Sequence, residues 1–169
     1  MLTALTAALL LAAPVTDRDN RFSATQADEA QRTLLAALNT SLDQVSGLYN
    51  WASSSVTLDR YISQQKALDL SRSIRSTEAE WSRMITAMPA AQAGKVNPEV
   101  TAMRDLFAKM QVNATKLSTT AGSAAPDRVD VRLITSDLYR ALMLAHDHQM
   151  AIGKKLGLSS GHKATDRAR

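Results

Sequence analysis

The chain contains no cysteine. That absence excludes disulfide bonds, thiol catalysis, iron–sulfur clusters and the covalent attachment of c-type haem. Aromatic residues are also scarce, at 4%, and the 169 residues include only six glycines and four prolines. Residues that favour strands and tight turns are therefore rare, whereas residues that favour helices, above all alanine and leucine, are abundant. This composition predicts an all-α protein.

The body of the chain also lacks an excess of charge of either sign. The net charge is +4 at pH 7, and the residues after Gly153 account for all of it. The charged residues of that segment are Lys154, Lys155, Lys163, Arg167 and Arg169, against Asp166. The other basic and acidic residues cancel. Because a nucleic-acid-binding protein usually carries a basic face on its fold, we expect no nucleic-acid partner and interpret residues 158–169 as a flexible basic tail.

Several motifs of catalysis are missing as well. The sequence has no E-x-x-H motif of the di-iron bundles and no Gly-rich phosphate loop. Glu78 and Glu80 are two residues apart, so on a helix they face different sides and do not form a carboxylate pair. We therefore expect a protein that is not an enzyme and has no catalytic residues.

The first 16 residues, MLTALTAALLLAAPVT, carry no charged side chain and end in small residues. This run resembles the apolar core of a signal peptide with cleavage near Ala12 or Ala13, and it is too short for a standard transmembrane helix. No lysine or arginine precedes the run, which a signal peptide normally has. We interpret residues 1–15 as a signal peptide and expect a periplasmic or secreted protein. A truncated membrane anchor and an ordinary apolar helix are the alternatives.

Apolar residues then recur at steps of three and four, which is the period of one buried helix face. Ser23 and Gln26 match a capping box at the start of the first helix. Its stripe is Ala27, Ala30, Leu34, Leu38, Leu42, Val45, Tyr49 and Ala52. Residues 53–57 predict a turn. The second helix covers about 58–88, with the stripe Ala67, Leu70, Ile74, Thr77, Trp81, Met84 and Met88, and Pro89 ends it.

Residues 89–97 then predict a linker, and Asn97-Pro98-Glu99 has the features of a helix start. The stripe of the third helix is Val100, Met103, Phe107, Met110, Ala114, Leu117 and Ala121, and Gly122 ends it. A second linker covers 123–127. The stripe of the fourth helix is Val131, Ile134, Leu138, Ala141, Ala145, His148 and Ile152, and Gly157 ends it.

Four amphipathic helices joined by short connections predict an up-down-up-down four-helix bundle over residues 16–157, followed by the short basic C-terminal tail. Helices of about 24 to 32 residues would be about 36–48 Å long. The alternating directions bring the end of the second helix, the start of the third and the end of the fourth to the same end of the bundle.

Methionine and histidine gather at that end. Met84, Met103 and His148 are placed on the core stripes, and Met88, His146 and Met150 lie near them. Thioether and imidazole are ligands that suit copper(I), and the pair also ligates haem iron. The competing interpretation is ordinary core packing, since methionine is a common gap-filler. Packing without a cofactor is the main expectation, with a copper site next and a haem site third.

Three functions therefore compete. The first is an exported, non-catalytic helical bundle that binds a protein partner or a small ligand. The second is a bundle that binds copper or haem through its methionine and histidine residues. The third is a membrane-tethered sensor or adaptor domain, which requires the N-terminal run to be an anchor. A homodimer is left open.

Overall fold

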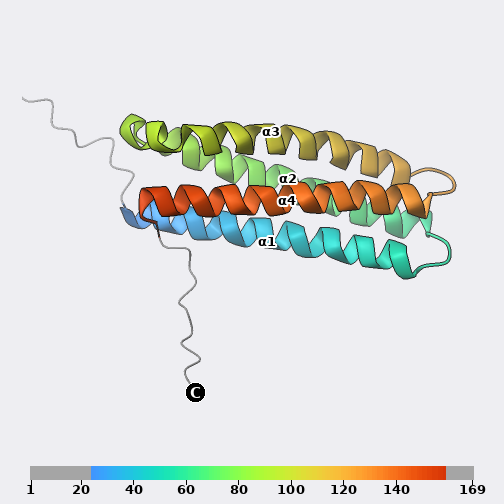
Figure 1. Ribbon diagram of the computed structural model, residues 1–169. Helices are drawn as coiled ribbons and strands as arrows, with labels where there is room; N and C mark the ends of the chain where they lie inside the picture. Colours follow the sequence, from blue (N-terminus) through green and yellow to red (C-terminus); the bar gives the residue numbers. More distant parts are fainter. Residues whose placement is uncertain (1–23, 159–169) are drawn as a thin grey trace, which may run out of the picture.

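A computed structural model describes residues 24–158 and shows an up-down-up-down four-helix bundle (Figure 1). The helices are α1 (Ala24–Ser54), α2 (Arg60–Ala87), α3 (Ala90–Ala121) and α4 (Arg128–Leu156). Each helix packs on its two neighbours in the ring α1–α2–α3–α4, and the contact between α4 and α1 closes the ring. The predicted signal peptide, the capping serine Ser23 and most of the predicted tail lie outside the described residues.

Polar side chains and one glycine fix where the helices begin and end. Asp59 accepts a hydrogen bond from the Ile62 amide at 2.8 Å, which caps the start of α2. Asp127 does the same for α4 by accepting from the Val129 amide at 2.7 Å. Gly157 ends α4 in the left-handed region, at φ 69°, as its position in the sequence predicted.

The predicted linker over residues 89–97 is wrong. α3 begins at Ala90, directly after Pro89, and continues through Pro98 to Ala121. Val96 lies inside the predicted linker, yet its side chain is fully buried in the core. Burial of this residue, together with the high helix propensity of the neighbouring alanines, outweighs the helix-breaking tendency of glycine and proline here.

The core follows the predicted stripes closely. Every residue of the α2 and α3 stripes is buried, and so is every residue of the α4 stripe except His148. On α1 the prediction is less accurate, because Ala30, Leu42 and Tyr49 are only partly buried on the flanks of the helix. The α1 residues that the prediction omitted from the core are Gln31, Leu35, Ser41 and Leu48.

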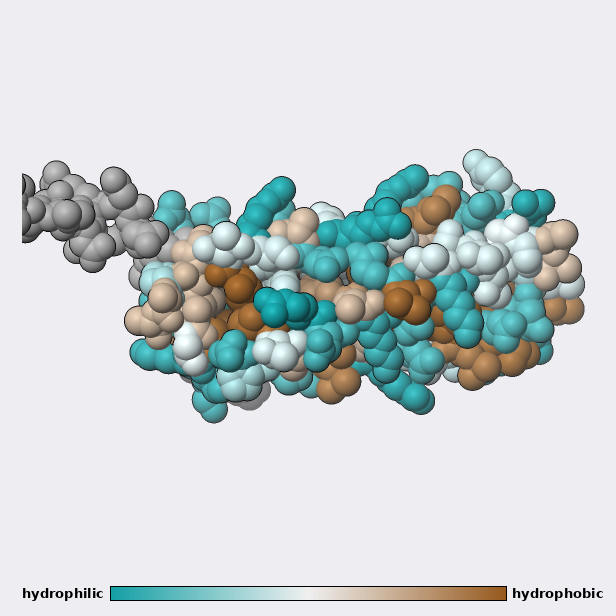
Figure 2. All heavy atoms as spheres, turned by 90° about the horizontal axis from the view of Figure 1, so that it is seen from above, coloured by the Kyte–Doolittle hydropathy of each residue, from teal (hydrophilic) through white to brown (hydrophobic). Residues whose placement is uncertain are grey.

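The connections α1–α2 and α3–α4 meet at one end of the bundle, opposite the end where α1 begins and α4 finishes (Figure 1). Two arginines join these connections. Arg60 Nε donates to the carbonyl of Gly122 at 2.8 Å, and Arg128 Nη1 donates to the carbonyl of Ser55 at 3.1 Å. Seen from above, the surface is mostly hydrophilic with separate apolar groups (Figure 2). None of the four helices within residues 24–158 combines the length and the apolar character of a membrane-spanning segment.

Candidate functional site

A pocket of about 240 Å³ opens between α1 and α4. Its lining residues are Ser46, Tyr49, Asn50, Ser136 and Tyr139. On α1, Ser46 follows the buried Val45 and Tyr49 follows the buried Leu48, and on α4 Tyr139 follows the buried Leu138. The pocket residues therefore lie on the sides of two helices whose other sides form the core, so the core packing holds the pocket walls in place.

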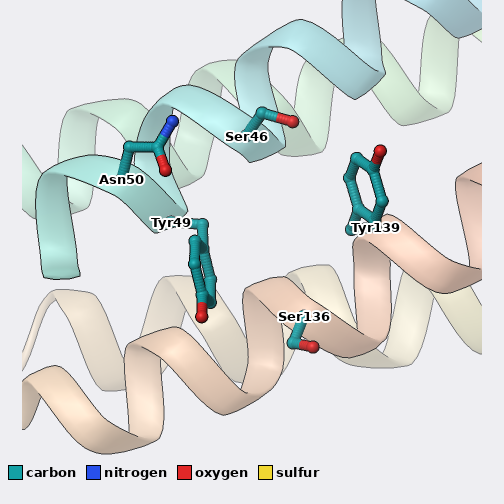
Figure 3. A pocket seen from close by; sticks show the side chains of 5 residues that line it. All are labelled: Ser46, Tyr49, Asn50, Ser136 and Tyr139. Carbon is teal, nitrogen blue, oxygen red and sulfur yellow. The ribbon is translucent and has the colours of Figure 1, made fainter.

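The two tyrosines point in opposite directions across the groove between the helices (Figure 3). Tyr49 extends from α1 toward α4, whereas Tyr139 rises from α4 toward α1. Ser46 and Ser136 lie between them, one on each helix. Tyr139 keeps 42% of its surface exposed, so the pocket is accessible from solvent.

Arg132, one turn before Ser136 on α4, sets the electrostatics beside the pocket. Its guanidinium carbon lies 5.6 Å from the centroid of the Tyr49 ring, within the range of a cation–π contact. Hydrogen bonding to Arg132 and the positive charge of Arg132 hold the pKa of Tyr49 below its ordinary value. The Nε of Arg132 is buried and has no hydrogen-bond partner among the described residues. Arg132 thus contacts the ring of Tyr49 and lowers the pKa of its hydroxyl group.

The side chains that line the pocket limit the chemistry that it can carry out. None of its five lining side chains is a carboxylate, an imidazole or an amine, so neither serine has a general base within the lining. Two aromatic rings, four hydroxyl groups and one amide suit a small neutral molecule with a flat ring and hydrogen-bonding groups on its edge. A volume below the usual 300–1,000 Å³ of drug-sized pockets fits a ligand of about one ring.

The structure places the predicted methionine and histidine residues at one end of the bundle, but not on one buried surface. Met84, Met103 and Met88 are buried in the core. His148 is only half-buried, and Gln149 takes its expected place on the seam of α4, so the prediction of a seam histidine is wrong. The next buried residue after Ala145 on this seam is four positions further along the helix, at Gln149, rather than three, at His148.

Gln149 forms a buried pair of amide side chains with Gln31 in this part of the core. Its Nε2 donates to Oε1 of Gln31 at 2.5 Å and approaches the Met84 sulfur at 3.7 Å. The Gln31 Nε2 donates in turn to the main-chain carbonyl of Gln149 at 3.1 Å. The sulfur of Met84 therefore faces an amide group rather than the imidazole that the sequence predicted.

The other predicted ligands lie outside the core. His148 keeps part of its surface exposed on α4, and His146 lies 3.8 Å from Asp147 of its own helix. Met150 is exposed on α4. Residues 24–158 hold no group of three histidine, cysteine or acidic side chains placed to bind a metal. Methionine sites fall outside that finding, so the copper and haem hypotheses stay predictions.

A match to the pattern G-x-S-x-G of serine hydrolases escaped the sequence prediction. It runs from Gly157 to Gly161. The pattern marks a nucleophile on a turn between a strand and a helix. Gly157 follows the helix α4, and no strand occurs within the described residues. The match therefore lacks its structural context on the side that the structure describes.

The sequence patterns do not predict the pocket, because Tyr49 falls on the core stripe and Tyr139 lies outside every stripe. The signal that marks them is their position on the flanks of helices that meet as antiparallel neighbours. Each tyrosine lies next to a buried leucine, Leu48 or Leu138, on its own helix. A large amphipathic ring at such a flank covers the groove between two helices.

Comparisons with known proteins add no identification. No protein-family model, no curated protein and no solved structure matches this chain. The case for a function therefore rests on the residues of the chain and on the geometry of the pocket.

Proposed function

We propose that this chain is an exported, non-catalytic helical bundle that binds a small neutral ligand between α1 and α4. The observation that carries the proposal is the pair of tyrosines, Tyr49 and Tyr139, on opposite sides of a pocket with a serine on each helix. The ring of the ligand stacks between or against the tyrosines, and its polar edge bonds to the serine hydroxyls and the Asn50 amide.

The contacts that the pocket offers set the expected affinity for a ligand. An aromatic contact contributes about 0.5–1.5 kcal/mol beyond the burial of its area, and a neutral hydrogen bond contributes about as much. One ring with two aromatic contacts and two hydrogen bonds then gains a few kcal/mol in addition to the hydrophobic term. After the cost of association is subtracted, we expect a dissociation constant between about 1 mM and 1 μM.

Ligand-observed NMR on the full chain tests the proposal with a panel of monosaccharides, neutral heteroaromatic rings and charged analogues of both. We expect neutral rings to bind and Tyr139→Ala to weaken the binding at least about tenfold. Tyr61→Ala is the matched control, because Tyr61 is 77% exposed in the first turn of α2 and outside the pocket. Binding that is equally strong in the two variants, or no binding from the whole panel, would refute the site.

Export is the second part of the proposal, and its support is the uncharged apolar run of the first 16 residues. The mature protein is expected to begin between about residue 13 and residue 17. Mass spectrometry of protein isolated from its native host measures that end directly. An intact Met1 in a soluble cytoplasmic fraction contradicts export, whereas an intact Met1 in the membrane fraction favours the tethered sensor or adaptor.

A further inference from the structure

Apolar residues on the surface of the described bundle concentrate on one helix. Ten large hydrophobic side chains of the described residues are exposed, and six of them belong to α4. These six are Val129, Leu133, Tyr139, Met143, Leu144 and Met150. The four others are Val56 before α2, Tyr61 and Ile62 in its first turn, and Val112 on α3. Apart from Tyr139, which lines the pocket, these α4 residues make the solvent side of the helix unusually apolar.

The outer residues of α4 follow one another at helical steps. Leu133, Arg140, Met143 and Asp147 are separated by steps of seven, three and four residues, which places them on a common side of the helix. All four are exposed. This side lies opposite the buried seam, so no other helix of the described bundle covers it.

We propose that this outer face of α4 binds the same face of a second copy of the chain, with the two helices antiparallel about a two-fold axis near Met143 and Leu144. The argument is charge complementarity. Arg140 and Asp147 lie three residues to either side of that centre, so antiparallel pairing brings Arg140 of each copy next to Asp147 of the other. A two-fold axis repeats this contact twice.

The apolar residues agree with the same arrangement. Met143 and Leu144 of the two copies meet at the axis, and Leu133 of one copy lies within about one turn of the level of Met150 of the other. A parallel pairing would instead bring like charges together, Arg140 against Arg140 and Asp147 against Asp147. The distribution of charge along α4 therefore favours the antiparallel pair.

The contact that Arg140 makes within its own chain competes only weakly with the proposed contact to Asp147 of a second copy. Its Nη1 lies 3.8 Å from Oδ1 of Asp137, and the two side chains are 76% and 55% exposed. An exposed pair at that distance contributes little to stability. Arg140 is therefore available to a second copy. An interface formed by one helix lies at the small end of specific interfaces. We expect a micromolar dissociation constant for the dimer.

Sedimentation velocity of the full chain from about 1 μM to 1 mM tests the inference. The wild type is expected to shift from monomer to dimer with rising concentration. Arg140→Asp and Asp147→Arg should each weaken the dimer at least about tenfold, because each places two like-charge contacts in the interface. The double variant Arg140→Asp with Asp147→Arg should restore the dimer to within about threefold of the wild type.

Arg72→Asp is the control, because Arg72 is 69% exposed and pairs with Asp69 within α2, away from the proposed face. It should leave the dimer unchanged. Monomer at every concentration, assembly beyond a dimer, or a double variant as weak as the single ones would each overturn the inference. Circular dichroism checks that each variant is folded. The proposed pocket is tested by ligand binding at residues outside this charge pair, so either proposal can fail alone.

Discussion

The buried amide pair of Gln31 and Gln149 limits the size of the side chain at a neighbouring position, residue 153. Both residues are fully buried, and each amide donates to the other residue. Gly153 lies one turn after Gln149, and a Cβ atom there would lie 2.5 Å from Nε2 of Gln31. The amide of Gln31 therefore occupies space that exists because residue 153 is a glycine.

Substituting this glycine separates the packing requirement from helix propensity. Gly153→Ala gains up to about 1 kcal/mol of helix propensity but displaces the Gln31 amide, which costs about 1–3 kcal/mol for each buried group left unpaired. A net loss in the free energy of unfolding is expected. Gly47→Ala is the control, because Gly47 is exposed within α1 and its Cβ would meet nothing within 4 Å. It should gain about 0.5–1 kcal/mol in urea denaturation. A gain of the same size at both positions would contradict the packing argument.

The exchange of His148 for Gln149 on the seam marks the limit of sequence reasoning at the scale of single residues. A helical stripe permits a step of three or four residues after Ala145, and both positions carry a polar side chain. The partner across the core decides between them. Gln31 offers an amide to Gln149, whereas His148 stays half-buried beside the seam.

Among the helices, α3 departs most from its prediction. The stripe from Val100 to Ala121 is confirmed in full, yet the helix begins ten residues before Val100. Gly94 and Pro98 lie four residues apart, so the proline ring is set against the carbonyl of the glycine, and that carbonyl has no helical hydrogen bond. Both residues are exposed, which gives the carbonyl access to water. Local propensity could not show this, because the burial of Val96 depends on the other helices.

Pro98→Ala tests whether the early part of α3 is a true extension of the helix. The substitution supplies the missing N–H group and removes the ring from the Gly94 carbonyl. An ideal helix would gain about 3 kcal/mol. We expect a smaller gain of about 1 kcal/mol, because the exposed Gly94 carbonyl already has access to water. Amide exchange before residue 98 should also become slower. Thermal or urea denaturation with hydrogen exchange measures both. A loss of stability would mean that the core packing requires the proline.

The pocket forms where α1 packs against α4. The apolar stripes predict that these helices are neighbours, but not which residues lie at the same level. Antiparallel neighbours and short connections place the two helices side by side, so the contact itself follows from the predicted fold. The level at which Tyr49 meets Arg132 and Ser136 does not follow, because it depends on the exact lengths of the connections and on the tilt of the helices. The sequence therefore predicted the scaffold of the site without locating the site.

For the whole molecule, one ion pair ties α3 to the last turn of α4. Lys155 Nζ lies 2.7 Å from Oε1 of Glu99, and the Glu99 side chain is only 14% exposed. The hydrogen bond from Lys155 is the main cause that holds the pKa of Glu99 below its ordinary value. A main-chain hydrogen bond and the charges of Lys155 and His148 add to it, and burial opposes them. Ionised Glu99 is therefore favoured in the folded protein relative to the unfolded chain.

This lowered pKa makes the stability of the bundle depend on pH in one direction. A carboxyl group whose pKa is lower in the folded state contributes stability above its unfolded pKa, and the contribution disappears as the pH falls through the folded pKa. Urea denaturation should therefore show that the free energy of unfolding falls between about pH 5 and pH 2.

Lys155→Gln should lower the free energy of unfolding at pH 7 and flatten this loss in acid, so that the variant and the wild type converge at the lowest pH. Arg72→Gln, which removes the exposed pair with Asp69, should give a curve parallel to that of the wild type. An equally steep acid loss in Lys155→Gln and in the wild type would show that Glu99 does not connect the two helices in solution.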